Sequence, residues 1–147
     1  KSSKLKIDPK VILSGRKTND EMPTFIAKRI DEKLKRKSKI LLLGLTFKED
    51  VPDLRNSKSF EIISFLKKKN HTLKQHDPYV KSKDLHFVSL TEIKKNSFDA
   101  LILAVPHKYY FQRMVFIKSL LKLDGIFFDI KGKVDFKRDK NINYWTL

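Results

Sequence analysis

The residues best suited to bind a phosphorylated ligand lie in one loop, which runs from Gly44 to Ser57 and reads GLTFKEDVPDLRNS. Lys48 and Arg55 supply cations for a diphosphate or for sugar oxygens, and Phe47 adds an aromatic ring. In a chain this basic, both cations could also be ordinary surface charges. A dinucleotide-binding loop would carry G-x-G-x-x-G, so that backbone amides reach a pyrophosphate, but only Gly44 is present. The loop therefore favours phosphate recognition by side chains and lacks the NAD fingerprint.

Chemistry that depends on thiols is excluded, because the sequence contains no cysteine. The chain can supply no disulfide, no thiolate metal ligand and no cysteine nucleophile. His76, His86 and His107 do not have the spacing of metal ligands, and only His107 falls near an expected cleft. We therefore expect no metal site and no catalytic residue in this chain.

The net charge of +16 raises the alternative of a basic module that binds nucleic acid without enzymatic activity. The basic residues comprise 27 lysines and only six arginines, and base readout relies heavily on the planar fork of arginine. The lysines are spread along the chain in short clusters such as Lys67–Lys69. A solvated, lysine-rich surface with general attraction for phosphates is the preferred interpretation, so no nucleic-acid partner is expected.

Apolar periodicity predicts strands that alternate with helices. An apolar residue recurs at every fourth position from Met22 to Leu34, which indicates an amphipathic helix from Thr18 onward. The remaining pattern predicts strands at 40–45, 72–76, 85–88, 98–105 and 126–130, and helices at 57–70, 90–96 and 108–123. This order predicts an α/β fold, namely a Rossmann-like, doubly wound, mostly parallel sheet with helices on both faces, preceded by the amphipathic helix.

In such a sheet, ligands bind beyond the carboxyl ends of the strands. Asp77, which ends the second predicted strand, either shapes a turn with Pro78 or takes the position of a ribose-binding acid. Trp145 either stacks on a base or packs against its own domain. No run of 18 apolar residues and no apolar signal core is present, so we expect no membrane association and a cytoplasmic location.

Four separated motifs resemble one known family. The run at 44–57 and the later segment His76-Asp77-Pro78-Tyr79-Val80 resemble the UDP-binding domain of the UDP-glucose/GDP-mannose dehydrogenase family. The segment at 12–22 and one carboxyl-terminal motif, made of residues 129–132 and 144–147, resemble the branch that acts on UDP-N-acetylhexosamines (GlcNAc, GalNAc or ManNAc). The resemblance covers nearly the whole chain, and the motifs occur in the order of the family.

The resemblance implies a division of labour. An amino-terminal Rossmann domain holds NAD and the catalytic cysteine, a central helix makes a homodimer, and a carboxyl-terminal domain holds the UDP-sugar. Residues 1–37 would end the dimerisation helix region, and residues 38–147 would form the UDP-sugar-binding domain. The complete enzyme would oxidise the sugar C6 alcohol to a carboxylate in two hydride transfers to NAD, giving a uronic acid for capsule or O-antigen polysaccharide. This chain would be inactive alone.

The resemblance also assigns roles to particular residues. Phe47 and Lys48 match a pair that contacts the substrate, and Arg55 matches an arginine that reaches NAD across the cleft. Lys131 falls where many members place a substrate-contacting arginine, and lysine keeps the charge but loses the bidentate fork. The implied substrate is a UDP-N-acetylhexosamine or another UDP-hexose. A UDP-glucose 6-dehydrogenase fragment and the basic nucleic-acid module remain the alternatives, and an independent NAD-binding domain is disfavoured by the missing glycines.

Overall fold

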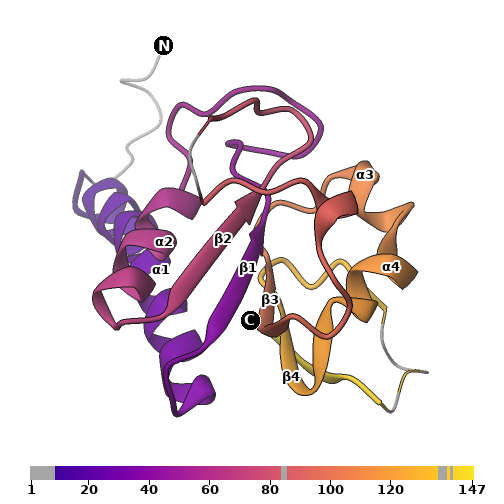
Figure 1. Cartoon of the computed structure of the whole chain (residues 1–147). Helices are drawn as coiled ribbons and strands as arrows, with labels where there is room; N and C mark the ends of the chain where they lie inside the picture. Colours follow the sequence, from indigo (N-terminus) through magenta and orange to yellow (C-terminus); the bar gives the residue numbers. More distant parts are fainter. Residues whose placement is uncertain (1–8, 84–85, 136–138, 140) are drawn as a thin grey trace.

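A parallel sheet lies between two layers of helices in the computed structural model, which describes residues 9–83, 86–135, 139 and 141–147 (Figure 1). The five strands stand in the order β2-β1-β3-β4-β5, and every neighbouring pair is parallel. Their bounds are β1 Lys39–Leu43, β2 Thr72–His76, β3 Phe98–Leu103, β4 Leu121–Asp129 and β5 Asn143–Thr146. This arrangement confirms the predicted doubly wound, Rossmann-like fold.

The helices cover both faces of the sheet, as predicted. One face carries α1 (Pro9–Leu34) and α2 (Ser59–Lys68), and the other carries α3 (Lys108–Phe111), α4 (Met114–Ser119) and the 3₁₀ turn η2 (Leu90–Glu92). Successive residues of a strand point to opposite faces, so Ile40 and Leu42 join the α1/α2 core while Leu41 and Leu43 join the other. Such double burial explains why β1 is a continuous apolar run rather than an alternating one.

Three helix predictions need correction. Helix α1 begins at Pro9 rather than near Thr18, because proline fits the first turn of a helix, where its missing N–H is not needed. The predicted helix at 108–123 is two short helices, since the backbone leaves the helical region at Arg113 (φ −119°, ψ 18°). The predicted helix at 90–96 is only the 3₁₀ turn η2, because the backbone is already extended at Ile93 (φ −85°, ψ 132°).

Two strand predictions also differ from the structure, and one strand was missed. Strand β4 begins at Leu121 rather than Ile126, because its first residue already pairs with Phe98 of β3. For the predicted strand at 85–88, the described residues form a single bridge between Phe87 and Gln75, and Leu85 lies outside the described residues. Strand β5 was not predicted, because Asn143–Thr146 has no apolar run of its own.

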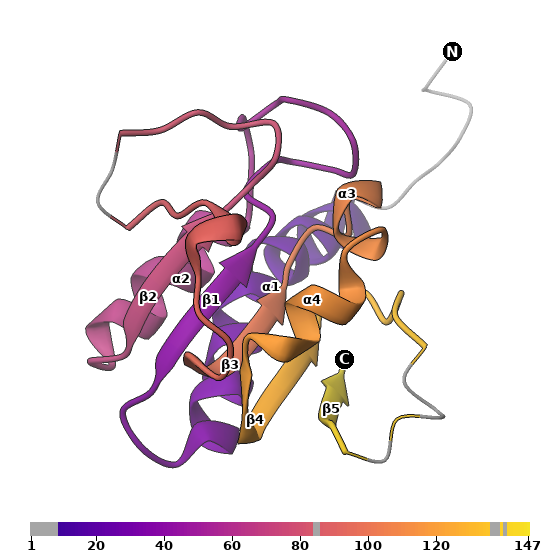
Figure 2. The same ribbon diagram turned by 45° about the vertical axis from the view of Figure 1, so that its right-hand side comes forward.

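Strand β5 extends the sheet beyond β4, on the side away from β2 (Figure 2). Trp145 pairs with Phe128 and packs edge-on against its ring, with 5.5 Å between the ring centroids. The Lys33 ammonium of α1 lies 5.9 Å from the centre of the indole. Trp145 therefore packs against its own domain, which was one of the two interpretations of this residue.

None of the helices in the described part of the chain is long and apolar enough to span a membrane.

Gly44, directly after β1, marks a close approach between two loops. Its φ is +98°, and a Cβ at this position would lie 2.6 Å from both the backbone nitrogen and the Cβ of Val105. Main-chain hydrogen bonds from Ala104 and Val105 to the Leu43 carbonyl hold the loop after β3 at this distance. Only glycine combines a positive φ with the absence of a Cβ. Gly44 therefore allows the β1–α2 loop to pass in direct contact with the loop after β3.

Replacing Gly44 should therefore destabilise the fold. Gly44→Ala is expected to lower the free energy of unfolding by about 2–4 kcal/mol, through backbone strain and overlap with Val105. Gly132→Ala is the control, because Gly132 also has a positive φ (+63°) but its added Cβ would meet only the Thr146 hydroxyl oxygen at 3.0 Å. Urea denaturation would measure both, and an equal loss in the two variants would contradict the steric argument.

Candidate functional site

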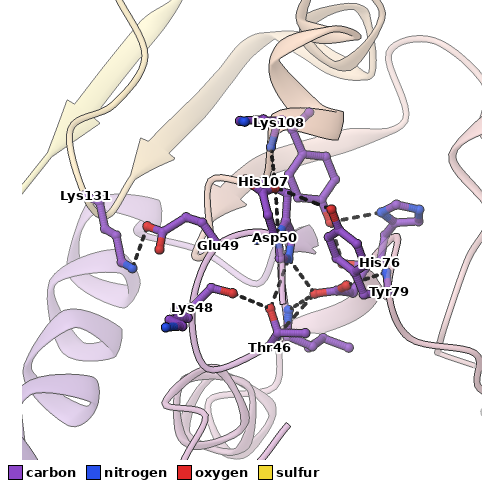
Figure 3. Close-up of polar contacts among 12 residues, drawn as sticks. Thr46, Lys48, Glu49, Asp50, His76, Tyr79, His107, Lys108 and Lys131 are labelled. Atoms are coloured by element: carbon purple, nitrogen blue, oxygen red, sulfur yellow. Dashed lines mark hydrogen bonds and ion pairs between the residues drawn. The ribbon is translucent and has the colours of Figure 1, made fainter. Parts of the chain in front are cut away.

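The loops after β1, β2, β3 and β4 meet at the carboxyl edge of the sheet, where a doubly wound fold binds its ligands (Figure 3). A cavity of about 340 Å³ opens there against helices α1 and α2. It is lined by Met22, Pro23, Ile26, Thr46, Phe47, Lys58, Ser59, Ile62, Ala104, Val105, Ile130, Lys131 and Leu147. The lining combines an apolar floor with two ammonium groups, which suits a ligand with a flat or apolar part and an anionic part.

The structure brings two of the four predicted site residues to this cavity. Phe47 lines it from the β1–α2 loop and keeps 53% of its surface exposed, and Lys131 lines it from the end of β4. Lys48 follows Phe47 and is exposed, but it does not line the cavity. Arg55 lies outside the lining as well, and its Nε and Nη2 atoms donate to the two oxygens of Asp53 at 3.0 and 3.1 Å.

Asp77 fixes the geometry of the loop after β1. The residue is 2% exposed, and its Oδ2 accepts hydrogen bonds from the backbone N–H groups of Leu45 (2.7 Å) and Thr46 (3.2 Å). Its Oδ1 accepts from the backbone N–H of Tyr79 at 2.8 Å. Burial alone would raise the pKa of Asp77, but hydrogen bonds from the His107 ring and these amides outweigh burial and lower the pKa. The charged carboxylate therefore holds the turn, which agrees with the turn interpretation of Asp77.

His107 links this carboxylate to the next part of the loop. Its Nδ1 accepts the Asp50 backbone N–H at 2.9 Å, so the ring proton resides on Nε2. Nε2 lies 2.9 Å from Asp77 Oδ2 and 3.1 Å from the Thr46 hydroxyl, which itself donates to the Lys48 carbonyl. The imidazole is fully buried, and its ring lies edge-on to that of Tyr79. Its position just after β3 was the sequence signal, but the contact with Asp50 could not be foreseen.

Glu49 forms an ion pair that connects the loop after β1 with the residues that follow β4. Its Oε1 lies 2.9 Å from the Lys131 ammonium, so the β1–α2 loop is joined to the end of β4 (Figure 3). Partial burial acts to raise the pKa of Glu49, but the hydrogen bond and the charge of Lys131 outweigh it and lower the pKa. Glu49 was missed at the sequence level because nothing in its spacing pairs it with Lys131.

Among the described residues, no three of the histidine, aspartate and glutamate side chains are grouped in a way that could hold a metal ion.

The fold and the cavity define a Rossmann-like domain with a ligand cavity at the carboxyl edge of its sheet. Residues 41–136 match the UDP-glucose/GDP-mannose dehydrogenase family, in the region described as its UDP binding domain. This match spans more than half of the chain, and the chain therefore belongs to that family.

Named relatives agree with this assignment. The chain is 33% identical to the UDP-N-acetyl-D-glucosamine 6-dehydrogenase of Pseudomonas aeruginosa, over 92% of this chain and 35% of that protein. It is 35% identical to Protein CapL of Staphylococcus aureus, over 86% of this chain and 32% of CapL. The chain thus spans about a third of the length of these relatives.

A solved structure shares the fold. The UDP-D-ManNAc dehydrogenase of Pyrococcus horikoshii superposes with a TM-score of 0.74 at 22% identity, over 98% of this chain and 35% of that one.

Loss of His107 should release the loop that carries Lys48 and Glu49. In His107→Leu, the Asp50 amide loses its acceptor and Asp77 loses a donor, so amide hydrogen exchange at Asp50 should quicken by about tenfold or more. His71→Leu is a matched control, because His71 likewise accepts the Ser38 N–H and lies 2.7 Å from Asp31, but beside the start of β1. If the rate of amide hydrogen exchange at Asp50 were unchanged in His107→Leu, His107 would not be what holds this loop in place.

His76 should make stability depend on pH. Burial lowers the pKa of His76 from 6.5 to about 4 in the folded chain, where Tyr110 donates to the His76 carbonyl and its hydroxyl lies 3.0 Å from Nδ1. The unfolded chain therefore takes up this proton first, and stability that is full above pH 6.5 is lost as the pH falls toward about 4. The shift corresponds to roughly 3 kcal/mol.

Denaturation from about pH 7.5, one unit above the unfolded-state pKa, down to about pH 4 would measure this dependence. His76→Asn should flatten the profile, because the amide can still donate to Tyr110 but does not titrate. His86→Asn, at an exposed histidine, should leave the profile as it is in the natural chain. A His76→Asn profile as steep as that of the natural chain would assign the pH dependence to other groups.

Proposed function

We propose that this chain binds the UDP part of a nucleotide sugar in the cavity at the carboxyl edge of its sheet. The observation that carries the proposal is that Phe47 and Lys131, which both belong to the region matched to the UDP-binding domain, line one cavity from separate loops. The Lys131 ammonium would contact a phosphate or a sugar oxygen, and the half-exposed Phe47 ring would cover an apolar face of the ligand. Lys48 would add charge at the rim of the cavity.

The proposed activity of the complete protein is the oxidation of the C6 alcohol of a UDP-N-acetylhexosamine to a carboxylate, with hydride transfer to NAD. This rests on the names of the relatives, of which the chain spans about a third. The catalytic cysteine would come from outside this chain, because its sequence contains none. In this proposal residues 1–37 end a dimerisation helix region of a homodimer, residues 38–147 form the UDP-sugar-binding domain, and the product is a uronic acid for surface polysaccharide.

NAD does not fit the β1–α2 loop of this chain as it fits a dinucleotide-binding domain. The loop has a single glycine, and a Cβ added to that glycine would lie 2.6 Å from Val105, so Val105 fills the space in which a pyrophosphate would need to approach the backbone. We therefore place NAD outside this loop. Arg55 is the residue proposed to reach it, and its guanidinium would first have to leave Asp53.

Replacing Lys48 tests its part in ligand binding. Lys48→Ala should weaken UDP binding by about 1.5–3 kcal/mol, the range for hydrogen bonds to charged groups, which is about 10- to 150-fold in Kd. Isothermal titration of the chain with UDP, UDP-N-acetylglucosamine and NAD would measure it. Lys94→Ala is the control, because Lys94 does not line the cavity and lies instead in another groove, beside Lys39 at the start of β1. Unchanged affinity in Lys48→Ala would remove Lys48 from the site, and saturable NAD binding by the natural chain would instead favour an NAD-binding domain.

A further inference from the structure

The two lysines that line the cavity are both close to carboxylates. Among the described residues that line it, only Lys58 and Lys131 have charged side chains, and none has a carboxylate side chain. Each nevertheless has a carboxylate partner from beyond the lining. Lys131 lies 2.9 Å from Glu49, whereas Lys58 lies 3.7 Å from Asp20 and 4.0 Å from Glu61. An anionic ligand that enters the cavity must therefore compete with these carboxylates, and the shortest of the three contacts is the one to Glu49.

The Lys131–Glu49 pair is built so that it can be exchanged at low energetic cost. Its side chains keep 39% and 34% of their surfaces exposed, and partly exposed ion pairs contribute little to stability. Glu49 also lies between two fixed points of the main chain. The Lys48 carbonyl accepts the Thr46 hydroxyl at 3.0 Å, and the Asp50 N–H donates to the buried His107 ring at 2.9 Å. The Glu49 side chain can thus turn away from Lys131 while the loop stays in place.

The ligand chemistry follows from what Glu49 supplies. A carboxylate at 2.9 Å from an ammonium provides a charged acceptor oxygen, and a phosphate oxygen provides the same. We propose that Glu49 stands in for an anionic group of the ligand on Lys131, so that binding of a nucleoside diphosphate exchanges Glu49 for a phosphate oxygen. Glu49 is then a specificity-determining residue, because a nucleoside without phosphate has nothing to exchange for it. This inference rests on the proposed function, since it concerns the same cavity.

A set of charge-removing variants tests the exchange. UDP and uridine would be titrated calorimetrically into the natural chain, Glu49→Gln, Lys131→Gln and the double variant. Glu49→Gln should bind UDP about three- to tenfold more tightly, because the competitor for Lys131 is gone, and should bind uridine as the natural chain does. Lys131→Gln should bind UDP more weakly. In the double variant the gain from Glu49→Gln should disappear, because it depends on Lys131.

A matched control separates this local effect from net charge. Glu92→Gln removes the same charge from η2, in a groove also lined by Lys39 at the start of β1 and Lys74 in the middle of β2, and should leave UDP affinity unchanged. Weaker or unchanged UDP binding in Glu49→Gln would overturn the inference, since Glu49 would then be orienting Lys131 or be irrelevant. A gain of equal size in Glu92→Gln, or one retained in the double variant, would overturn it too. If neither the natural chain nor any variant binds UDP, the proposed function itself fails.

Discussion

The charged carboxylate of Asp77, buried at the end of β2, is the constraint on which the candidate site depends. It accepts hydrogen bonds from backbone N–H groups of the loop after β1 and of its own turn, and from the Nε2–H of His107 in the loop after β3. A buried carboxylate is stable only when its oxygens are satisfied in this way. Three strand ends are thereby tied to one side chain. The loop that carries Phe47, Lys48 and Glu49 is therefore positioned by hydrogen bonds to Asp77 rather than by a helix or strand.

In the same region, acidic side chains pair with the cations, so the edge of the sheet is not lined by unpaired positive charges alone. Arg55 is held by Asp53 two residues away, and Lys131 is held by Glu49 across the edge of the sheet. The acidic residues are few, 17 against 33 basic ones, yet several of them sit beside the cations at this edge. Local pairing leaves the overall charge available for long-range attraction of phosphates, while under the proposed exchange a ligand at the cavity would take the place of a carboxylate.

Much of the fold could be predicted from the sequence because its central strands carry their own signal. Strands β1 and β3 are apolar runs buried on both faces, and such runs indicate a parallel sheet. Strand β5 escaped prediction because its residues are held by pairing with β4 rather than by a periodic pattern of their own. The break at Arg113 escaped as well, since apolar spacing continues through it and only the backbone angles reveal it.

The candidate site also contains residues that could be predicted from the sequence and residues that could not. The resemblance led to Phe47 and Lys131, which the structure places at one cavity, whereas the contacts of Glu49 and Asp50 depend on residues far along the chain and leave no local pattern. The binding roles of Phe47, Lys48, Lys131 and Arg55 remain predictions.

The strand order has a consequence for how the chain reaches its native state. Among the described strands of this sheet, β1 is synthesised first, but it lies inside the sheet, and Ile40 must pair with both Leu73 and Ala100 before both edges of β1 are covered. Partners so distant along the chain favour slow folding, during which an apolar segment with free backbone groups is open to aggregation. Lys35, Arg36 and Lys37 precede β1, and Lys39 is its first residue. Mutual repulsion among these charges can keep unfinished chains apart, so the basic character of the protein also protects it before its site exists.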